Sequence, residues 1–130
     1  MSVRCLLDTH VVLSVLRNDI EQRFPLVARL LLAEGTIAFA SVASLWEIAI
    51  KSRLGKLDPG MELKDLAGFL MASGFRILPI DLLHVVEMAE PVPATNDPFD
   101  RPLLAQCHVE RLQLVTADRL LIDHPLSWKS

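Results

Sequence analysis

The 130-residue sequence contains no tyrosine, only two cysteines and no excess of basic charge. Cys5 and Cys107 lie in apolar runs, and no Cys-x-x-Cys or Cys/His ligand spacing is present, which argues against a structural zinc site. The 13 basic and 16 acidic residues give a formal charge of −3, so nucleic-acid binding would have to depend on a local patch. Neither GxxxxGK(S/T) nor GxGxxG occurs, which argues against nucleotide-cofactor chemistry.

Long hydrophobic runs are also missing. No apolar stretch approaches the roughly 18 residues of a membrane span, and the short run before Asp8 does not resemble a signal peptide. Hydrophobic residues nevertheless make up 52% of the chain, which is ample for one well-filled core. We therefore expect a single cytoplasmic domain over residues 1–130, with no membrane association.

Strand-like and helix-like segments alternate along the chain. Four short apolar runs predict buried strands, at residues 3–7, 36–40, 75–80 and 112–116. Helical spacing is found at residues 10–17, 22–33, 42–54, 62–73, 81–90 and 102–111. Gly35, Gly55 and Gly74 each follow a helical segment, where a helix end favours a residue that adopts positive φ. Strands separated by helices predict an α/β fold with a parallel sheet covered on both faces.

Acidic residues stand directly after two of these predicted strands. Asp8 follows the first strand and Asp118 follows the last. Because ligands of open parallel sheets bind outside the carboxyl ends of the strands, both are candidates for chemistry. Each also has a structural explanation, since aspartate caps helix N-termini and complements the helix dipole. Thr116 lies close to Asp118 and places a hydroxyl where it can hydrogen-bond a carboxylate.

Glu47 stands among apolar residues in the helix after the second strand. Ser44 and Glu47 fit a capping box, and Glu47 with Lys51 fits a stabilising i, i+4 ion pair. If the helix begins at Ser41 instead, Glu47 lies nearly two turns inside it and the capping role disappears. A carboxylate amid that much apolar surface needs a partner or a cation.

The segment 96–107 contributes Asp97 and Asp100. Asp97 before Pro98 matches an N-cap followed by proline at the first helical position, which favours a structural role for Asp97. A helix that begins at Asp100 is the alternative, because Pro102 then falls in the first turn and removes no backbone hydrogen bond. In both cases Asp100 lies at the start of the helix.

Parallel topology would bring Asp8, Glu47, Asp100 and Asp118 to one edge of the sheet. Carboxylates packed together raise one another's pKa, and a divalent cation relieves their repulsion. An all-oxygen ligand set favours Mg²⁺ or Mn²⁺ over zinc. Such an ion activates water and stabilises the charge of a phosphodiester under attack. The four acids together therefore predict metal-dependent hydrolysis.

Four segments resemble, in order, the successive motifs of PIN-domain ribonucleases, and most closely those of the VapC-type toxins of bacterial toxin–antitoxin pairs. The segments are LLDTHVVL, SVASLWEIAIKSRLGKL, NDPFDRPLLAQC and LVTADRLL, which together span nearly the whole chain. The resemblance implies a three-layer α/β/α sandwich around a parallel sheet of four to five strands. It also implies an Mg²⁺- or Mn²⁺-dependent endoribonuclease that acts as a toxin, is commonly a homodimer and is silenced by a small antitoxin whose C-terminal segment occupies the catalytic groove.

The resemblance also assigns roles to individual residues. The catalytic and metal-binding quartet that it implies is Asp8, Glu47, Asp100 and Asp118. Thr9, Thr116 and Asp97 match supporting positions. The chain departs from the pattern at Asn96, where relatives usually carry histidine, and at Pro102, where they carry an apolar residue.

Local basic residues reconcile the acidic charge with an RNA substrate. Arg101 and Arg119 each directly follow a predicted metal ligand, and Arg53 lies in KSRLGK. Our hypothesis is that these arginines contact backbone phosphates near the ions. Phe24 and Trp128 are apolar residues that we expect to be exposed, as at a dimer or antitoxin surface.

Three other functions compete with the nuclease. A phosphatase with Asp8 as nucleophile generally requires a second aspartate two residues on, where this chain has His10. A phospho-accepting receiver domain would use Asp81 as the acceptor. It also requires a lysine after the last strand, and the residues at that point, Thr-Ala-Asp at 116–118, include none. A PIN-like scaffold without catalysis would bind a partner only, and the presence of all four carboxylates argues against it.

Overall fold

The computed structural model describes residues 2–87 and 97–130. The strands are β1 (Arg4–Leu7), β2 (Ile37–Ser41), β3 (Arg76–Leu78) and β4 (Gln113–Val115). The helices are α1 (Thr9–Leu16), α2 (Ile20–Arg23), α3 (Pro25–Leu32), α4 (Val42–Arg53), the 3₁₀ turn η1 (Leu63–Asp65), α5 (Leu66–Ala72), α6 (Leu82–Val86) and α7 (Asp100–Glu110). No helix in the described ranges is long and apolar enough to cross a membrane.

The four strands form one parallel sheet in the order β3-β2-β1-β4. Leu7 at the end of β1 pairs with Ala40 of β2 on one side and with Val115 of β4 on the other. The chain thus leaves β1 towards one side of the sheet and returns later to its other side. This reversal creates a topological switch point at the carboxyl ends of β1 and β4, where parallel sheets bind ligands.

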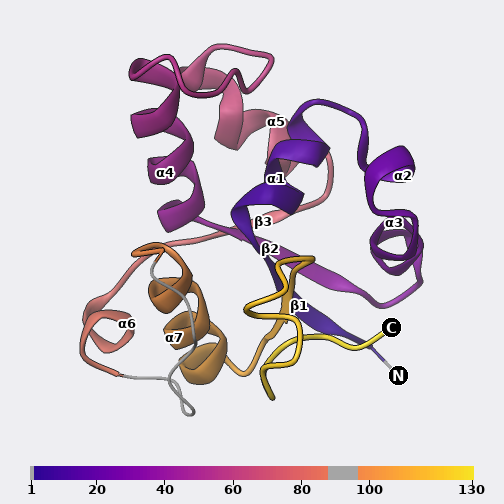
Figure 1. Cartoon of the computed structure of the whole chain (residues 1–130). Helices are drawn as coiled ribbons and strands as arrows, with labels where there is room; N and C mark the ends of the chain where they lie inside the picture. The colour runs from indigo at the N-terminus through magenta and orange to yellow at the C-terminus, as the bar shows by residue number, and fades with distance from the viewer. Residues whose placement is uncertain (1, 88–96) are drawn as a thin grey trace.

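Helices cover both faces of the sheet, as the alternation of side chains along β1 requires. Cys5 and Leu7 face a core built with side chains from α1, α3, α4 and α5. Leu6 faces the opposite way, into a second core that includes Leu103 and Leu104 of α7. Figure 1 shows α6 and α7 on one side of the sheet and α1, α3 and α5 on the other. The predicted α/β fold with a covered parallel sheet is therefore confirmed.

Several predicted helix bounds need correction. The helix expected over residues 22–33 is wrong: α2 ends at Arg23 and α3 begins at Pro25. Phe24 between them has φ −136° and ψ 67°, because proline disfavours a helical conformation in the residue before it. The helix expected over 81–90 ends at Val86, and positions 88–90 lie outside the described residues.

The predicted helix ends at glycine are confirmed. Gly35, Gly55 and Gly74 have φ values of 84°, 72° and 95°. In this left-handed region an added Cβ would strain the backbone, so glycine favours these turns.

Candidate functional site

Asp8 lies at the carboxyl end of β1 and is the N-cap of α1. Its carboxylate accepts a hydrogen bond from the backbone N–H of Val11 at 2.9 Å, and its own N–H donates to the carbonyl of Val115 at 3.0 Å. The side chain of Thr116 also donates to this carboxylate. The capping role is therefore confirmed, and the neighbouring strand β4 holds the same carboxylate from the other side.

Burial decides the electrostatics of Asp8, which is only 3% exposed. Loss of hydration raises the pKa of Asp8, the hydrogen bonds from Thr116 and Val11 oppose that rise, and the charge of Asp118 adds to it. Asp118 therefore acts on Asp8 across the switch point between β1 and β4. Asp118 itself accepts from the N–H of Leu120 at 2.9 Å, as expected of the cap of a turn.

Glu47 lies nearly two turns inside α4 and does not form a capping box. The N-cap of α4 is Ser41, whose hydroxyl accepts from the N–H of Ala43. The alternative helix start is thus the one observed, and the capping box expected at Ser44 is wrong. Glu47 is 4% exposed, so its charge depends on the partners around it.

Two partners hold Glu47. The hydroxyl of Thr9 donates to Oε1 of Glu47 at 2.8 Å, and it lies 3.0 Å from the hydroxyl oxygen of Ser44. The ammonium of Lys51 contacts Oε2 at 2.5 Å, so the predicted i, i+4 ion pair is present. Because Thr9 directly follows Asp8, this hydrogen bond ties α1 and Asp8 to Glu47 of α4.

Lys51 also connects the N-terminus of α7 to this group. Its hydrogen bond to Glu47 raises the pKa of Lys51, burial opposes the rise, and the charges of Glu47, Asp97 and Asp100 raise it further. Asp100 is the first residue of α7 and is 8% exposed. Glu47 of α4 and the two acids at the start of α7 therefore all act on one ammonium group.

The start of α7 differs from one of the two predicted arrangements. The N-cap is Phe99, and Asp97 instead accepts from the N–H of Phe99 at 2.9 Å within the preceding turn. Asp97 is thus not the N-cap, although its role here is structural. Pro102 falls in the first turn of α7, where its missing N–H removes no helical bond. Asn96 lies outside the described residues.

The four predicted acids form two groups of interacting residues, which Thr9 connects. Asp8 and Asp118 interact across the switch point, Glu47 and Asp100 act on Lys51, and Thr9 joins the two groups. Asp8, Glu47 and Asp100 are each less than one-tenth exposed. Carboxylate oxygens suit a hard divalent cation such as Mg²⁺ or Mn²⁺. In the described structure, however, no three of these four acids bring their oxygens within 4.8 Å of one another. Their role as metal ligands remains a prediction.

The three arginines that were predicted to contact phosphates are on the surface. Arg53, Arg101 and Arg119 are all exposed, at the end of α4, in the first turn of α7 and directly after Asp118. Trp46 and Phe99, which directly precede Glu47 and Asp100, form an edge-to-face pair with ring centroids 6.3 Å apart.

A second group of ligating side chains, which the sequence analysis did not identify as a group, joins α6 to α7. Oxygen and nitrogen atoms of Asp81, His84 and Glu110 all lie within 4.8 Å of one another. Both ring nitrogens of the buried His84 are engaged, because Nδ1 accepts from the N–H of Asp81 at 3.1 Å and Nε2 lies 2.8 Å from the Glu110 carboxylate. These hydrogen bonds indicate a structural link. The signal for it was an aspartate three residues before a histidine, which is the spacing of a cap.

Replacing His84 should therefore weaken the fold. His84→Ala leaves Glu110 and the N–H of Asp81 without their partner and opens space in the interior, so we expect a loss of about 2–3 kcal/mol in the free energy of unfolding. Urea denaturation measures the loss. His108→Ala, an exposed histidine of the same helix α7, is the control. Equal stability of the two variants would contradict a structural link.

The sequence matches the family model described as PIN domain over residues 5–125. No curated protein and no solved structure matches the chain. The matched range contains all four predicted acids and the two threonines that contact them.

Proposed function

Because the chain belongs to the PIN domain family, we propose that it is a divalent-metal-dependent endoribonuclease and the toxin of a toxin–antitoxin pair. PIN domains are generally nucleases, and nucleases are hydrolases. The VapC-type subfamily, the dependence on Mg²⁺ or Mn²⁺ and the RNA substrate are the finer parts of the proposal. The proposed partners are RNA, a small antitoxin and a second copy of the chain.

The burial of three of the predicted acids, Asp8, Glu47 and Asp100, is the observation that carries this proposal. Buried carboxylates destabilise a fold unless a cation compensates for them. A bound Mg²⁺ or Mn²⁺ would supply an activated water and stabilise negative charge on the phosphate. In the proposed site, Asp8, Glu47, Asp100 and Asp118 bind the ion, Thr116 orients Asp8, and Thr9 orients Glu47.

An RNA cleavage assay tests the proposal. The purified chain, free of any partner, is incubated with a mixed RNA pool in Mn²⁺, in Mg²⁺ and in chelator. We expect cleavage with either metal and none in chelator. A folded chain that leaves the RNA intact with both metals would support the alternative, a PIN-like scaffold that only binds a partner. Cleavage that continues in chelator would contradict the metal mechanism.

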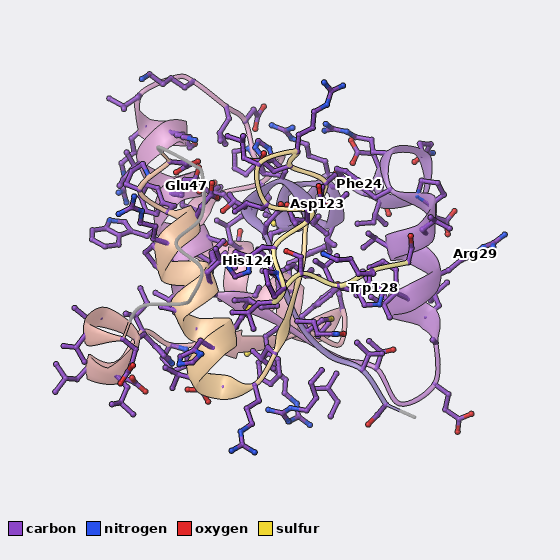
Figure 2. All side chains as sticks on the ribbon, turned by 60° about the horizontal axis from the view of Figure 1, so that its bottom comes forward. Phe24, Arg29, Glu47, Asp123, His124 and Trp128 are labelled. Carbon is purple, nitrogen blue, oxygen red and sulfur yellow. The ribbon has the colours of Figure 1, made fainter. Side chains whose placement is uncertain are left out.

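Arg101 is proposed to contact a backbone phosphate. Neutralising one phosphate contributes about 0.7–0.9 to the slope of log affinity against log salt, so Arg101→Ala should lower that slope by roughly this amount. RNA binding in chelator measures the slope without cleavage. Arg29→Ala is the matched control, because Arg29 extends outward from α3 (Figure 2). An unchanged slope for Arg101→Ala would remove this residue from the phosphate contacts.

A further inference from the structure

A cavity of about 480 Å³ opens between the N-terminus of α3 and the C-terminal segment of the chain. Phe24, Trp128 and Asp123 lie on its wall, together with Thr116 and Ala117, which follow β4. In Figure 2, Trp128 on the C-terminal segment lies towards α3, with Phe24 and Asp123 nearby. The cavity thus brings together two aromatic rings from opposite ends of the sequence.

Both aromatic rings are held in place. Phe24 and Trp128 are not exposed as expected but half-buried, because each packs against the core that α1, α3, α4 and α5 share. The N–H of Trp128 donates to the carbonyl of Leu114 in β4 at 2.8 Å. The ammonium of Lys129 bonds the carbonyls of Ile122 and His124, which fixes the segment on either side. Such fixed rings bind a planar ligand with little loss of conformational entropy.

One residue, Thr116, connects the cavity to the acidic site. Thr116 lines the cavity, and its hydroxyl donates to the carboxylate of Asp8. Ala117 separates Thr116 from Asp118, another predicted metal ligand. Since β4 and β1 define the topological switch point of the sheet, the cavity and the acids lie at the same ligand-binding edge. A chain bound at the acids would therefore pass the mouth of the cavity.

Positive charge at the rim matches a polyanion. The guanidinium of Arg23 lies 5.5 Å from the centroid of the Phe24 ring and is exposed to solvent. Lys129 lines the cavity itself, and the exposed Arg119 follows Asp118. Aromatic walls with cations beside them are the features that bind single-stranded nucleic acid, because bases stack on the rings and phosphates pair with the cations.

We propose that this cavity is a nucleobase subsite, in which Phe24 and Trp128 stack a base of single-stranded RNA next to the phosphodiester held at the acids. This inference rests on the proposed nuclease function, because it takes RNA as the substrate. Asp123 on the wall offers a carboxylate acceptor to the donors on the edge of the base. The subsite makes the enzyme select unpaired RNA, since a base within a duplex cannot enter it.

Fluorescence of Trp128 tests the subsite directly. In a Trp46→Phe background, Trp128 is the one remaining tryptophan. The probe is a five-nucleotide single-stranded RNA added in chelator, so that binding is measured without metal or cleavage. We expect saturable quenching of Trp128, and Phe24→Leu should weaken the affinity about five- to hundredfold, the effect of losing one stacked base. Leu32→Ala, an exposed apolar residue of the same helix α3, is the matched control.

The outcomes separate this inference from the nuclease proposal. Quenching with no metal-dependent cleavage would overturn the nuclease and leave the subsite standing, whereas cleavage without quenching would overturn the subsite. Phe24→Leu keeps the apolar bulk, and circular dichroism verifies that the variant is folded. An affinity unchanged in folded Phe24→Leu, or equal binding of a matched duplex, would also overturn the subsite. Emission that shifts with protein concentration but not with RNA would assign the cavity to a second copy of the chain.

Discussion

Asp8→Asn should abolish metal-dependent RNA cleavage, with a loss of about a thousandfold or more, while making the metal-free protein more stable. Asparagine has the same shape, so its side-chain oxygen still accepts the N–H of Val11 and caps α1. It carries no charge, and burial is what raises the pKa of Asp8. Removing a buried charge that opposes folding should add about 0.5–2 kcal/mol to the free energy of unfolding.

The stability gain has a defined dependence on pH. Because the pKa of Asp8 in the folded state is raised above its unfolded value, the carboxyl favours folding at acid pH and loses that advantage as pH rises towards and through the folded pKa. The advantage of Asp8→Asn should therefore be largest at neutral pH and shrink on acidification. Urea denaturation across pH measures it.

Asp65 provides the matched control for Asp8. It is exposed, and although it is the N-cap of α5, its side chain makes no capping hydrogen bond. Asp65→Asn should change neither cleavage nor the pH dependence of stability. Cleavage that survives in Asp8→Asn would show that another nuclease contaminates the preparation or that Asp8 binds no ion. A loss of stability at neutral pH would contradict the opposing effect of its buried charge.

Lys51→Met should destabilise the metal-free protein by about 1–3 kcal/mol. The substitution leaves Glu47, which is 4% exposed, without its cationic partner and exposes it to the charges of Asp97 and Asp100. Breaking a fully buried pair costs about 3–5 kcal/mol, and the side chain of Lys51 is 39% exposed, so solvent screening reduces the effect. Thermal unfolding in chelator measures the loss.

Manganese should restore most of the stability that Lys51→Met loses. A bound divalent cation supplies the positive charge that the acids require, and a ligand that binds only the folded state stabilises it by mass action. The matched control is Lys56→Met, at an exposed lysine just beyond α4. This variant should be as stable as the wild type, and Mn²⁺ should stabilise it no more than the wild type. If Mn²⁺ stabilises the Lys51 variant no more than the wild type, the acids around Lys51 do not share the ion.

Local patterns predicted the parts of the fold that depend on neighbouring residues. The apolar run before Asp8 specifies a buried strand and Asp8 specifies the following helix cap, so both could be placed from the sequence. The same holds for the glycines at helix ends, because their positive φ is a local requirement. From parallel topology we then predicted that the acids lie at one edge of the sheet.

Contacts between distant segments could not be predicted in this way. Ser41 and Ser44 both fit the cap of α4, and the observed choice follows the strand register, since Ser41 ends β2 and its hydroxyl lies against the Gln106 amide oxygen of α7. The hydrogen bond from Thr9 to Glu47 spans 38 positions, and that between His84 and Glu110 spans 26. The cavity between Phe24 and Trp128 joins segments still farther apart.

Isothermal titration calorimetry with Mn²⁺ tests most directly whether the four acids jointly bind a hard cation. The wild-type chain should give a saturable heat of binding, and Asp8→Asn combined with Glu47→Gln should give none although the variant is folded. Asp65→Asn should titrate like the wild type. A folded wild-type chain that produces no heat with Mn²⁺, or a double variant that binds the ion as tightly as the wild type, would contradict the account.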